Sequence, residues 1–167
     1  MGRTKRHFIK AKDFIKIYQR LPQILQLALK DELTKKPEFE KIEFEKNEIY
    51  LINKQPVLVK SHEEKIFPTL HFSEALKLLP KVIVDQGAIP YICRGADVMR
   101  PGIVRIDGDF QPSSLVVVVD EKHLKPIAVG LSKYSSTEIN MLKSGKVVEN
   151  VHYVGDKLWK FLSNLKF

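Results

Sequence analysis

Apolar residues near the start of the chain recur at the i, i+3, i+4, i+7 spacing that places side chains on one face of a helix. These residues are Phe14, Ile17, Tyr18, Leu21, Leu25, Ala28 and Leu29. Proline breaks the interior of a helix but suits its first position, so Pro22 divides the pattern. We therefore expect two helices, about residues 11–20 and 22–33, or one kinked helix, with Pro37 closing the segment.

The apolar pattern then changes from a helical period to alternation and short apolar runs. The segments concerned are 41–45, 49–52 and 57–59, separated by turn-like polar triplets. This arrangement is typical of a β-meander with one face in water. Ser73 is placed to cap a short helix that Pro80 ends. Helices followed by a meander predict an α+β domain over residues 1–80.

The second half of the chain consists of short apolar segments divided by capping and turn residues. The segments lie at 82–84, 115–119, 127–131 and 147–154. Asp85 stands where an N-cap belongs and Gly95 where a C-cap glycine belongs, which predicts a short helix near 86–94. Many short strands with two short helices suggest a compact, barrel-like β domain over residues 81–167.

Three further local patterns mark turns and helix ends in this half. Pro101-Gly102 is the residue pair typical of a type II turn, in which glycine takes a positive φ. Ser135 and Glu138 form a capping-box pair that begins a helix, and Gly145 ends it. The tail over 156–165 fits either a strand or a helical turn.

The net charge of the chain indicates which class of partner it binds. The 167 residues carry 28 Lys and Arg against 20 Asp and Glu, a net charge of +8. Residues 1–20 alone hold seven bases and one acid. Such a field attracts polyanions, of which nucleic acid is the commonest partner of a small basic protein and anionic membrane the next.

Membrane insertion and secretion are not expected. The longest stretch free of charged residues, 110–119, is ten residues long, about half of what a membrane span requires. The basic N-terminus has no apolar segment behind it, so it does not resemble a secretory signal. Cys93 is the single cysteine and has no internal disulfide partner. We expect a cytoplasmic protein in a reducing compartment.

The sequence shows no pattern that predicts catalysis, a cofactor or a metal. It lacks the glycine-rich loops that cradle nucleotide phosphates, and its five histidines have no metal-site spacing. His152 and Asp156 are four residues apart, as a base and its orienting carboxylate would be. A packed histidine beside a turn aspartate explains the same spacing, and a buried thiol explains Cys93. We therefore expect a protein that is not an enzyme and that has no cofactor.

Two motifs in the second half carry a family resemblance. Residues 84–88 read Val-Asp-Gln-Gly-Ala and residues 94–103 read Arg-Gly-Ala-Asp-Val-Met-Arg-Pro-Gly-Ile. With the later strand at 128–132 and the segment 148–159, they resemble the PUA domain, an RNA-binding module of pseudouridine synthases and archaeosine transglycosylases. The resemblance implies a mixed pseudo-barrel over residues 81–160 that binds structured RNA.

The resemblance also implies a set of RNA-binding residues. Glycines without Cβ atoms let a backbone approach closely, and arginines suit bidentate phosphate contacts. The expected site residues are Gly87, Ala88, Arg94, Gly95, Ala96, Arg100, Gly102 and Arg105. For the glycines, tight packing of the barrel is an equally weighted explanation. We expect Arg100 to make an ordered phosphate contact, and Arg3, Lys5 and Arg6 to act through a diffuse field.

The ending 148–159 and the segment 67–70 resemble more narrowly the family of small translation-associated PUA proteins, which includes the malignant T-cell amplified sequence protein. This resemblance implies a non-catalytic role with structured RNA, either tRNA or ribosomal RNA, and with the small ribosomal subunit in initiation or recycling. It also implies a protein partner similar to the density-regulated protein.

Other functions remain open from the sequence. The chain fits an accessory subunit that targets RNA for an RNA-modifying enzyme such as a pseudouridine synthase or archaeosine transglycosylase. It also fits a protein-interaction adaptor whose charge is incidental. RNA binding that weakens with salt separates the RNA-binding roles from the adaptor, because phosphate contacts release counterions. An enzyme with an unfamiliar site would need a deep pocket with convergent polar groups.

Overall fold

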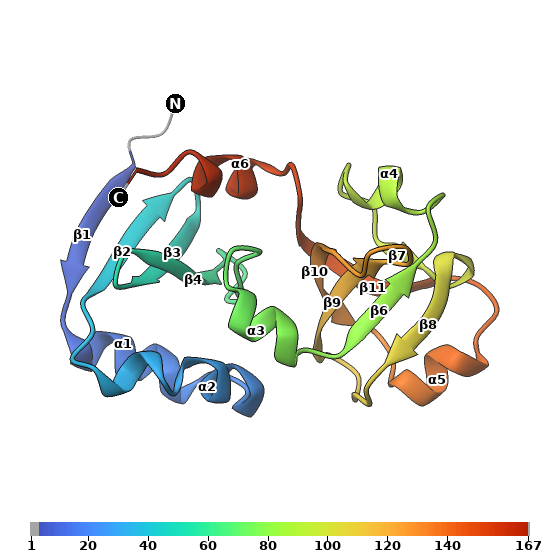
Figure 1. Ribbon diagram of the computed structural model, residues 1–167, viewed down its shortest axis with the longest axis horizontal. Helices are drawn as coiled ribbons and strands as arrows, with labels where there is room; N and C mark the ends of the chain where they lie inside the picture. The colour runs from blue at the N-terminus through green and yellow to red at the C-terminus, as the bar shows by residue number, and fades with distance from the viewer. Residues whose placement is uncertain (1–3, 167) are drawn as a thin grey trace. The chain divides into compact units, whose positions relative to one another are not determined.

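The computed structural model describes residues 4–166, which divide into two compact units. Unit 1 is formed by the described residues up to Leu78 together with Leu165 and Lys166, and unit 2 by Leu79–Asn164. Figure 1 shows both, with the first in blue to green and the second in green to red. The fold class is α+β, as the sequence predicts. Independent folding of residues 81–167 stays a prediction.

Unit 1 is built on an antiparallel sheet whose strands follow one another in chain order, β1-β2-β3-β4-β5. The predicted meander is confirmed by the three central strands. The bounds are β1 (Lys5–Ile9), β2 (Phe39–Phe44), β3 (Asn47–Ile52), β4 (Gln55–Lys60) and β5 (Ile66–Pro68). The sheet's buried side chains come mainly from β3 and β4.

Two helices divided by Pro22 cover this sheet, as the apolar spacing predicts (Figure 1). Phe14 of α1 is fully buried, stacks on Phe39 at 4.5 Å between ring centroids and meets Tyr50 edge-on. Aromatic pairs of this kind stabilise a core beyond their buried area. The helical elements of unit 1 are α1 (Ala11–Gln19), α2 (Gln23–Leu29), the 3-10 helix η1 (Glu32–Thr34) and α3 (Ser73–Leu78).

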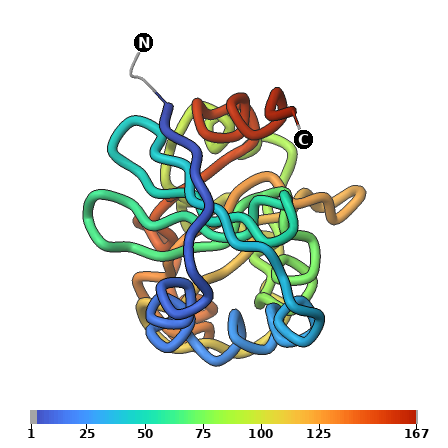
Figure 2. The backbone as a smooth tube through the Cα atoms, turned by 90° about the vertical axis from the view of Figure 1, so that its left-hand side faces the viewer, coloured from blue at the N-terminus to red at the C-terminus, as the bar shows by residue number. Residues whose placement is uncertain are grey.

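The basic N-terminal segment is more ordered than we expect of a terminus that acts only through its charge. Lys5 and Arg6 lie in β1, the blue strand ahead of the helices in Figure 2, which pairs with β2. Arg6 forms a two-pronged ion pair with Glu40, with Nε–Oε2 2.6 Å and Nη2–Oε1 3.2 Å. The Glu40 side chain is buried, so removing Arg6 would leave a buried carboxylate without this partner. Arg3 lies outside the described residues.

Unit 2 is a mixed sheet in the order β7-β11-β10-β9-β6-β8, in which β6 and β9 are parallel and the other pairs antiparallel. Its strands enclose an apolar core that includes Val82, Val116 and Val148. The predicted strands are confirmed, and β11 begins and ends one residue earlier than predicted. The bounds are β6 (Lys81–Val84), β7 (Val98–Met99), β8 (Ile103–Asp107), β9 (Leu115–Asp120), β10 (Pro126–Ser132) and β11 (Lys146–Tyr153).

Short helices close the ends of this sheet. The Ser135 hydroxyl accepts the Glu138 N–H at 3.1 Å, so the predicted cap is confirmed, although the helix ends at Met141, before Gly145. The tail, for which strand and helix were both open, forms a helix. The helical elements of unit 2 are α4 (Ile89–Ile92), the 3-10 helix η2 (Arg100–Gly102), α5 (Ser136–Met141) and α6 (Lys157–Ser163).

Asp156 joins β11 to α6 through three hydrogen bonds. Its carboxylate accepts the N–H groups of Trp159 at 2.6 Å and Tyr153 at 3.0 Å, and contacts Nδ1 of the fully buried His152 at 2.8 Å. Burial acts to raise the pKa of this carboxyl, but the His152 contact and the two N–H groups outweigh it and lower the pKa. The geometry is that of a helix cap with a packed histidine.

The depressed pKa of Asp156 predicts a pH-dependent stability. A carboxyl whose pKa is lower when folded stabilises the protein above its unfolded value, about 3.9, and loses this effect as pH falls. We expect Asp156→Asn to lower the free energy of unfolding by about 1–2 kcal/mol at pH 7, because the amide keeps one acceptor oxygen but loses the charge and the second acceptor. In urea titrations followed by the fluorescence of Trp159, the single tryptophan, this difference should shrink as the pH falls below about 4. A difference that is constant with pH would contradict the assignment.

Candidate nucleic-acid interface

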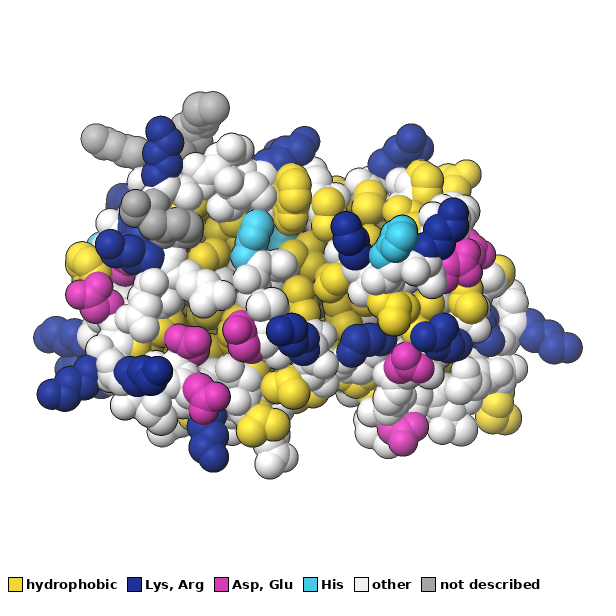
Figure 3. Space-filling view, in the orientation of Figure 1, with side chains coloured by type: hydrophobic (Ala, Val, Ile, Leu, Met, Phe, Trp, Pro, Cys, Tyr) yellow, Lys and Arg dark blue, Asp and Glu magenta, His cyan; other side chains and the backbone are white. Residues whose placement is uncertain are grey.

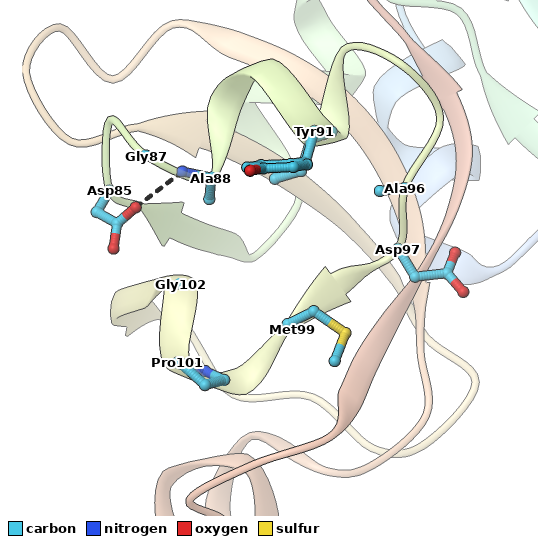
Figure 4. Close-up of a pocket in the computed structure, with 10 residues that line it drawn as sticks. Asp85, Gly87, Ala88, Tyr91, Ala96, Asp97, Met99, Pro101 and Gly102 are labelled. Carbon is cyan, nitrogen blue, oxygen red and sulfur yellow. Dashed lines mark hydrogen bonds between the residues drawn. The ribbon is translucent and has the colours of Figure 1, made fainter.

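A pocket of about 370 Å³ opens on the surface of unit 2, between α4 and the segment that leads from β7 into η2 (Figure 4). Its lining is mostly apolar. The residues are Asp85, Gly87, Ala88, Tyr91, Ile92, Ala96, Asp97, Met99, Pro101 and Gly102. The two sequence motifs of the PUA resemblance, residues 84–88 and 94–103, therefore form opposite walls of one pocket.

The turn before α4 is fixed by its own aspartate and by η2. Asp85 Oδ1 accepts the Ala88 N–H at 2.9 Å, the dashed line in Figure 4, and the Asp85 N–H donates to the Gly102 carbonyl at 2.9 Å. A Cβ placed on Gly102 would come within 3.1 Å of the Ala88 Cβ. Glycine at this position therefore permits the close approach of the two walls.

Two predictions about this region need correction. The helix begins at Ile89 rather than directly after Asp85, because the intervening residues form a turn that the Asp85 carboxylate caps. Pro101-Gly102 does not form a type II turn. It forms the 3-10 helix η2, and Gly102 lacks the positive φ that a type II turn requires. The fixed φ of proline fits a 3-10 helix as well as a type II turn. Glycine is needed at position 102 because a Cβ there would crowd the Ala88 side chain.

The far end of α4 is fastened to β11 by Asn150. Its Nδ2 donates to the carbonyls of Ile92 and Ala96, both at 3.0 Å, and its own N–H donates to Asp97 Oδ1 at 2.9 Å. Gly95 has φ +100°, which confirms its predicted place as the C-cap glycine. These bonds hold α4 and the loop after it in a fixed position over the pocket.

An aromatic ring and a thioether flank the pocket's opening. Tyr91 of α4 is 65% exposed and Met99 of β7 is 46% exposed, and their side chains face the same space from opposite walls (Figure 4). Asp85 and Asp97, the acidic lining residues, each already accept a backbone N–H. The pocket thus offers a flat aromatic surface and an apolar floor, which suit a planar ring better than an ion.

The predicted glycine and alanine residues are brought together by the fold. Gly87, Ala88, Ala96 and Gly102 all line the pocket. Gly95 shapes the loop behind it without lining it, and a Cβ there would lie 3.2 Å from the Tyr153 hydroxyl. Their grouping around one pocket agrees with a shared role, whereas their direct contact with RNA stays a proposal.

The three predicted arginines are in different situations. Arg94, at the end of α4, is exposed and has no side-chain partner within the described part of the chain. Arg105 is exposed on β8 beside Asp107, at 3.5 Å between Nε and Oδ1. Arg100 turns into the unit instead, where Nε donates to the Ile139 carbonyl at 2.7 Å and Nη1 to the Ile103 carbonyl at 3.3 Å. Arg94 is therefore the arginine best placed to meet a phosphate.

Sequence reasoning did not assign Tyr91, Met99 or Asn150 to the site. Tyr91 was indistinguishable from a core aromatic by its spacing, since most aromatics in a chain of this size are buried. Met99 and Asn150 stand inside the motifs, and only the fold shows that one lines the pocket and the other fastens its wall.

The remaining candidates for chemistry do not form a site. Burial raises the pKa of the Cys93 thiol, which disfavours the reactive thiolate. Among residues 4–166, no group of three or more His, Cys, Asp or Glu is arranged to hold a metal ion. The same residues contain no helix that is both long and apolar enough to cross a membrane.

Comparison with known sequences agrees with the geometry. Residues 80–154 match the PUA domain family. An uncharacterised protein of Methanocaldococcus jannaschii is 40% identical over 160 residues, which cover 94% of this chain and 96% of that protein. Translation machinery-associated protein 20 of Schizosaccharomyces pombe is 35% identical, with 91% of this chain and 84% of that protein covered. Malignant T-cell-amplified sequence 1-A of Xenopus laevis is 30% identical, with 67% and 64% covered.

Solved structures extend the likeness to both units. The crystal structure of a hypothetical protein from Pyrococcus horikoshii has a TM-score of 0.79 and 32% identity, and it covers 95% of this chain and 99% of that one. A PUA-domain structure from Aeropyrum pernix has a TM-score of 0.75 and 25% identity, with 96% and 92% covered. The chain therefore belongs to the family of PUA-domain proteins that includes translation machinery-associated protein 20 and the malignant T-cell-amplified sequence proteins.

Proposed function

We propose that this protein binds structured RNA, either tRNA or RNA of the small ribosomal subunit, through the pocket face of unit 2. The observation that carries the proposal is the exposed Tyr91 ring over an apolar pocket. Arg94 follows three residues later in the chain, is exposed and has no side-chain partner among residues 4–166. In this role the protein acts in the cytoplasm on the translation machinery, in initiation or recycling, and catalyses no reaction itself.

The physical basis is the chemistry of an unpaired nucleotide. A base presents an apolar π-face that stacks on tyrosine, and the adjoining phosphate attracts arginine. Proteins read structured RNA mainly where loops or ends splay bases out, because paired bases are hidden in the deep major groove. A pocket of about 370 Å³ is large enough to take one such base.

The relatives' names support the translational part of the proposal. A relative named as associated with the translation machinery aligns with 91% of this chain, so the similarity includes both units. The PUA match supports RNA as the ligand of unit 2. A protein partner similar to the density-regulated protein completes the proposed assembly on the small subunit.

Replacing Tyr91 by alanine tests the proposal. We expect the affinity for tRNA or small-subunit RNA to fall about tenfold, because base–aromatic stacking contributes about 1–3 kcal/mol per base. Tyr134→Ala is the matched control, since Tyr134 is also exposed in unit 2 but does not line the pocket. Binding is measured by fluorescence anisotropy, with thermal melts to confirm that both variants are folded.

The two variants must differ for the proposal to stand. Wild-type affinity in Tyr91→Ala would show that RNA is not bound at the pocket face. An equal loss in both tyrosine variants would show a general effect of exposed aromatic residues and would equally contradict the proposal.

A further inference from the structure

The turn between β9 and β10, residues 121–125, presents a basic tip on the surface of unit 2. Lys122, His123 and Lys125 are all exposed. Neither lysine has an ion-pair partner among the residues that the structure describes, in contrast to Arg105. Glu121 offsets one of the charges. Figure 3 shows Lys and Arg side chains grouped with a histidine over this part of unit 2.

A single buried carboxylate organises the turn. Asp120 is 7% exposed and accepts the N–H groups of Lys122 at 3.1 Å, His123 at 2.9 Å and Lys125 at 2.7 Å. These bonds, the His123 N–H above all, lower the pKa of the Asp120 carboxyl. The Leu124 N–H also donates to the Asp120 carbonyl at 3.0 Å, and Leu124 takes φ +53°. The backbone beneath the lysines is therefore fixed before any ligand arrives.

The turn lies next to the pocket. Asp120 pairs with Val84 in the parallel register of β9 and β6, and the Glu121 N–H donates to the Val84 carbonyl at 3.1 Å. Val84 directly precedes Asp85, the first residue of the pocket wall. The basic tip and the wall that carries Tyr91 thus begin from neighbouring strand ends.

We propose that the turn 121–125 binds phosphates of the RNA strand that leaves the pocket, and that Asp120 is the positioning residue that holds Lys122 and Lys125 toward that strand. This inference rests on the proposed function and adds a second contact surface to the same site. The chemistry is that of a phosphodiester backbone, because two ammonium groups on a rigid turn meet phosphates without sequence preference.

Removing the two lysines tests the contact. The double variant Lys122→Ala/Lys125→Ala should bind unfractionated tRNA about tenfold more weakly at low salt. The slope of log affinity against log salt should become shallower by about one to two, since each phosphate contact contributes about one. Lys133→Ala/Lys160→Ala is the matched control, because it removes the same charge from exposed sites of unit 2 outside the pocket and the turn. Equal effects in the two double variants would overturn the proposal.

The role of Asp120 needs a readout that a purely structural residue would not change. Asp120→Asn keeps both lysines but removes the charged acceptor, so we expect a several-fold loss of affinity and a shallower salt slope. The same substitution made in the Lys122→Ala/Lys125→Ala background should have little further effect, because the groups it positions are gone. A loss of equal size in both backgrounds would overturn the positioning role.

Comparison with Tyr91→Ala separates the two proposals. If Tyr91→Ala is impaired while the lysine variant binds like its control, the pocket remains the RNA site and the turn is not part of it. If both bind like wild type, RNA is bound elsewhere on the protein, which overturns the proposed function together with this inference.

Discussion

Replacing Gly130 by alanine is expected to lower the free energy of unfolding of unit 2 by about 3 kcal/mol, at the upper end of the cost of overpacking a core. Gly130 lies in β10 opposite Asn150, where the register with β11 shifts. A Cβ at this position would overlap a methyl group of Val148 and come within 2.8 Å of the Glu149 carbonyl oxygen. Because part of the obstacle is backbone, a change of side-chain rotamer does not relieve it.

Gly87→Ala is the control for this substitution. Gly87 also has a φ outside the left-handed region, but a Cβ there meets its nearest neighbour, Asp85 Oδ1, at an ordinary 3.4 Å. Urea unfolding followed by Trp159 fluorescence should show a near-wild-type midpoint for Gly87→Ala and a much lower one for Gly130→Ala. Similar midpoints would mean that β10 and β11 are not as closely packed as the structure has them.

Arg100→Ala is expected to cost about 2 kcal/mol of stability and to affect RNA binding only indirectly. Its guanidinium donates to the carbonyls of Ile139 in α5 and Ile103 at the start of β8. Hydrogen bonds from a charged donor contribute about 1.5–3 kcal/mol. The Ile139 carbonyl keeps the Leu142 N–H as a partner at 3.1 Å, so the expected cost lies toward the lower part of this range. The substitution should therefore loosen the attachment of α5 to the rest of unit 2.

Arg94→Ala is expected to weaken RNA binding without lowering stability, the reverse of Arg100→Ala. Arg94 is exposed and without a side-chain partner in the described residues, so its removal should leave the melting temperature unchanged and weaken RNA binding by about 1–3 kcal/mol. Melting curves and a salt series on both variants distinguish the roles. If Arg100→Ala melts like wild type while its salt slope falls by about one, Arg100 is a phosphate contact, as the sequence alone suggests.

Much of the fold was predictable because its signals are local. Helical spacing on either side of Pro22, the Ser135 cap and the apolar runs of β9 and β10 each follow from neighbouring residues, and the structure confirms them. The strand β1 was not predicted. Its residues are almost all exposed. It is held by pairing with β2 and by the Arg6–Glu40 ion pair, contacts between residues thirty or more positions apart.

The candidate site was predictable only in its backbone. Gly102 marks where the walls of the pocket approach one another, because a Cβ there would come within 3.1 Å of the Ala88 Cβ. The direction of a long side chain depends on distant partners. The motif therefore could not show that Arg100 turns inward while Arg94 has no side-chain partner among the described residues. Tyr91 is a candidate for base stacking because its ring is exposed, and the sequence alone does not show that exposure.

Photochemical crosslinking of bound RNA, with the attached peptide identified by mass spectrometry, tests the central claim most directly. The wild-type protein is irradiated with tRNA and with small-subunit RNA at moderate salt, and the modified residues are mapped. The account predicts crosslinks within α4 and the segment through η2, residues 89–102, at Tyr91 above all. Crosslinks confined to unit 1, for example at the exposed Lys12 and Lys16 of α1, with none in residues 85–102, would contradict it.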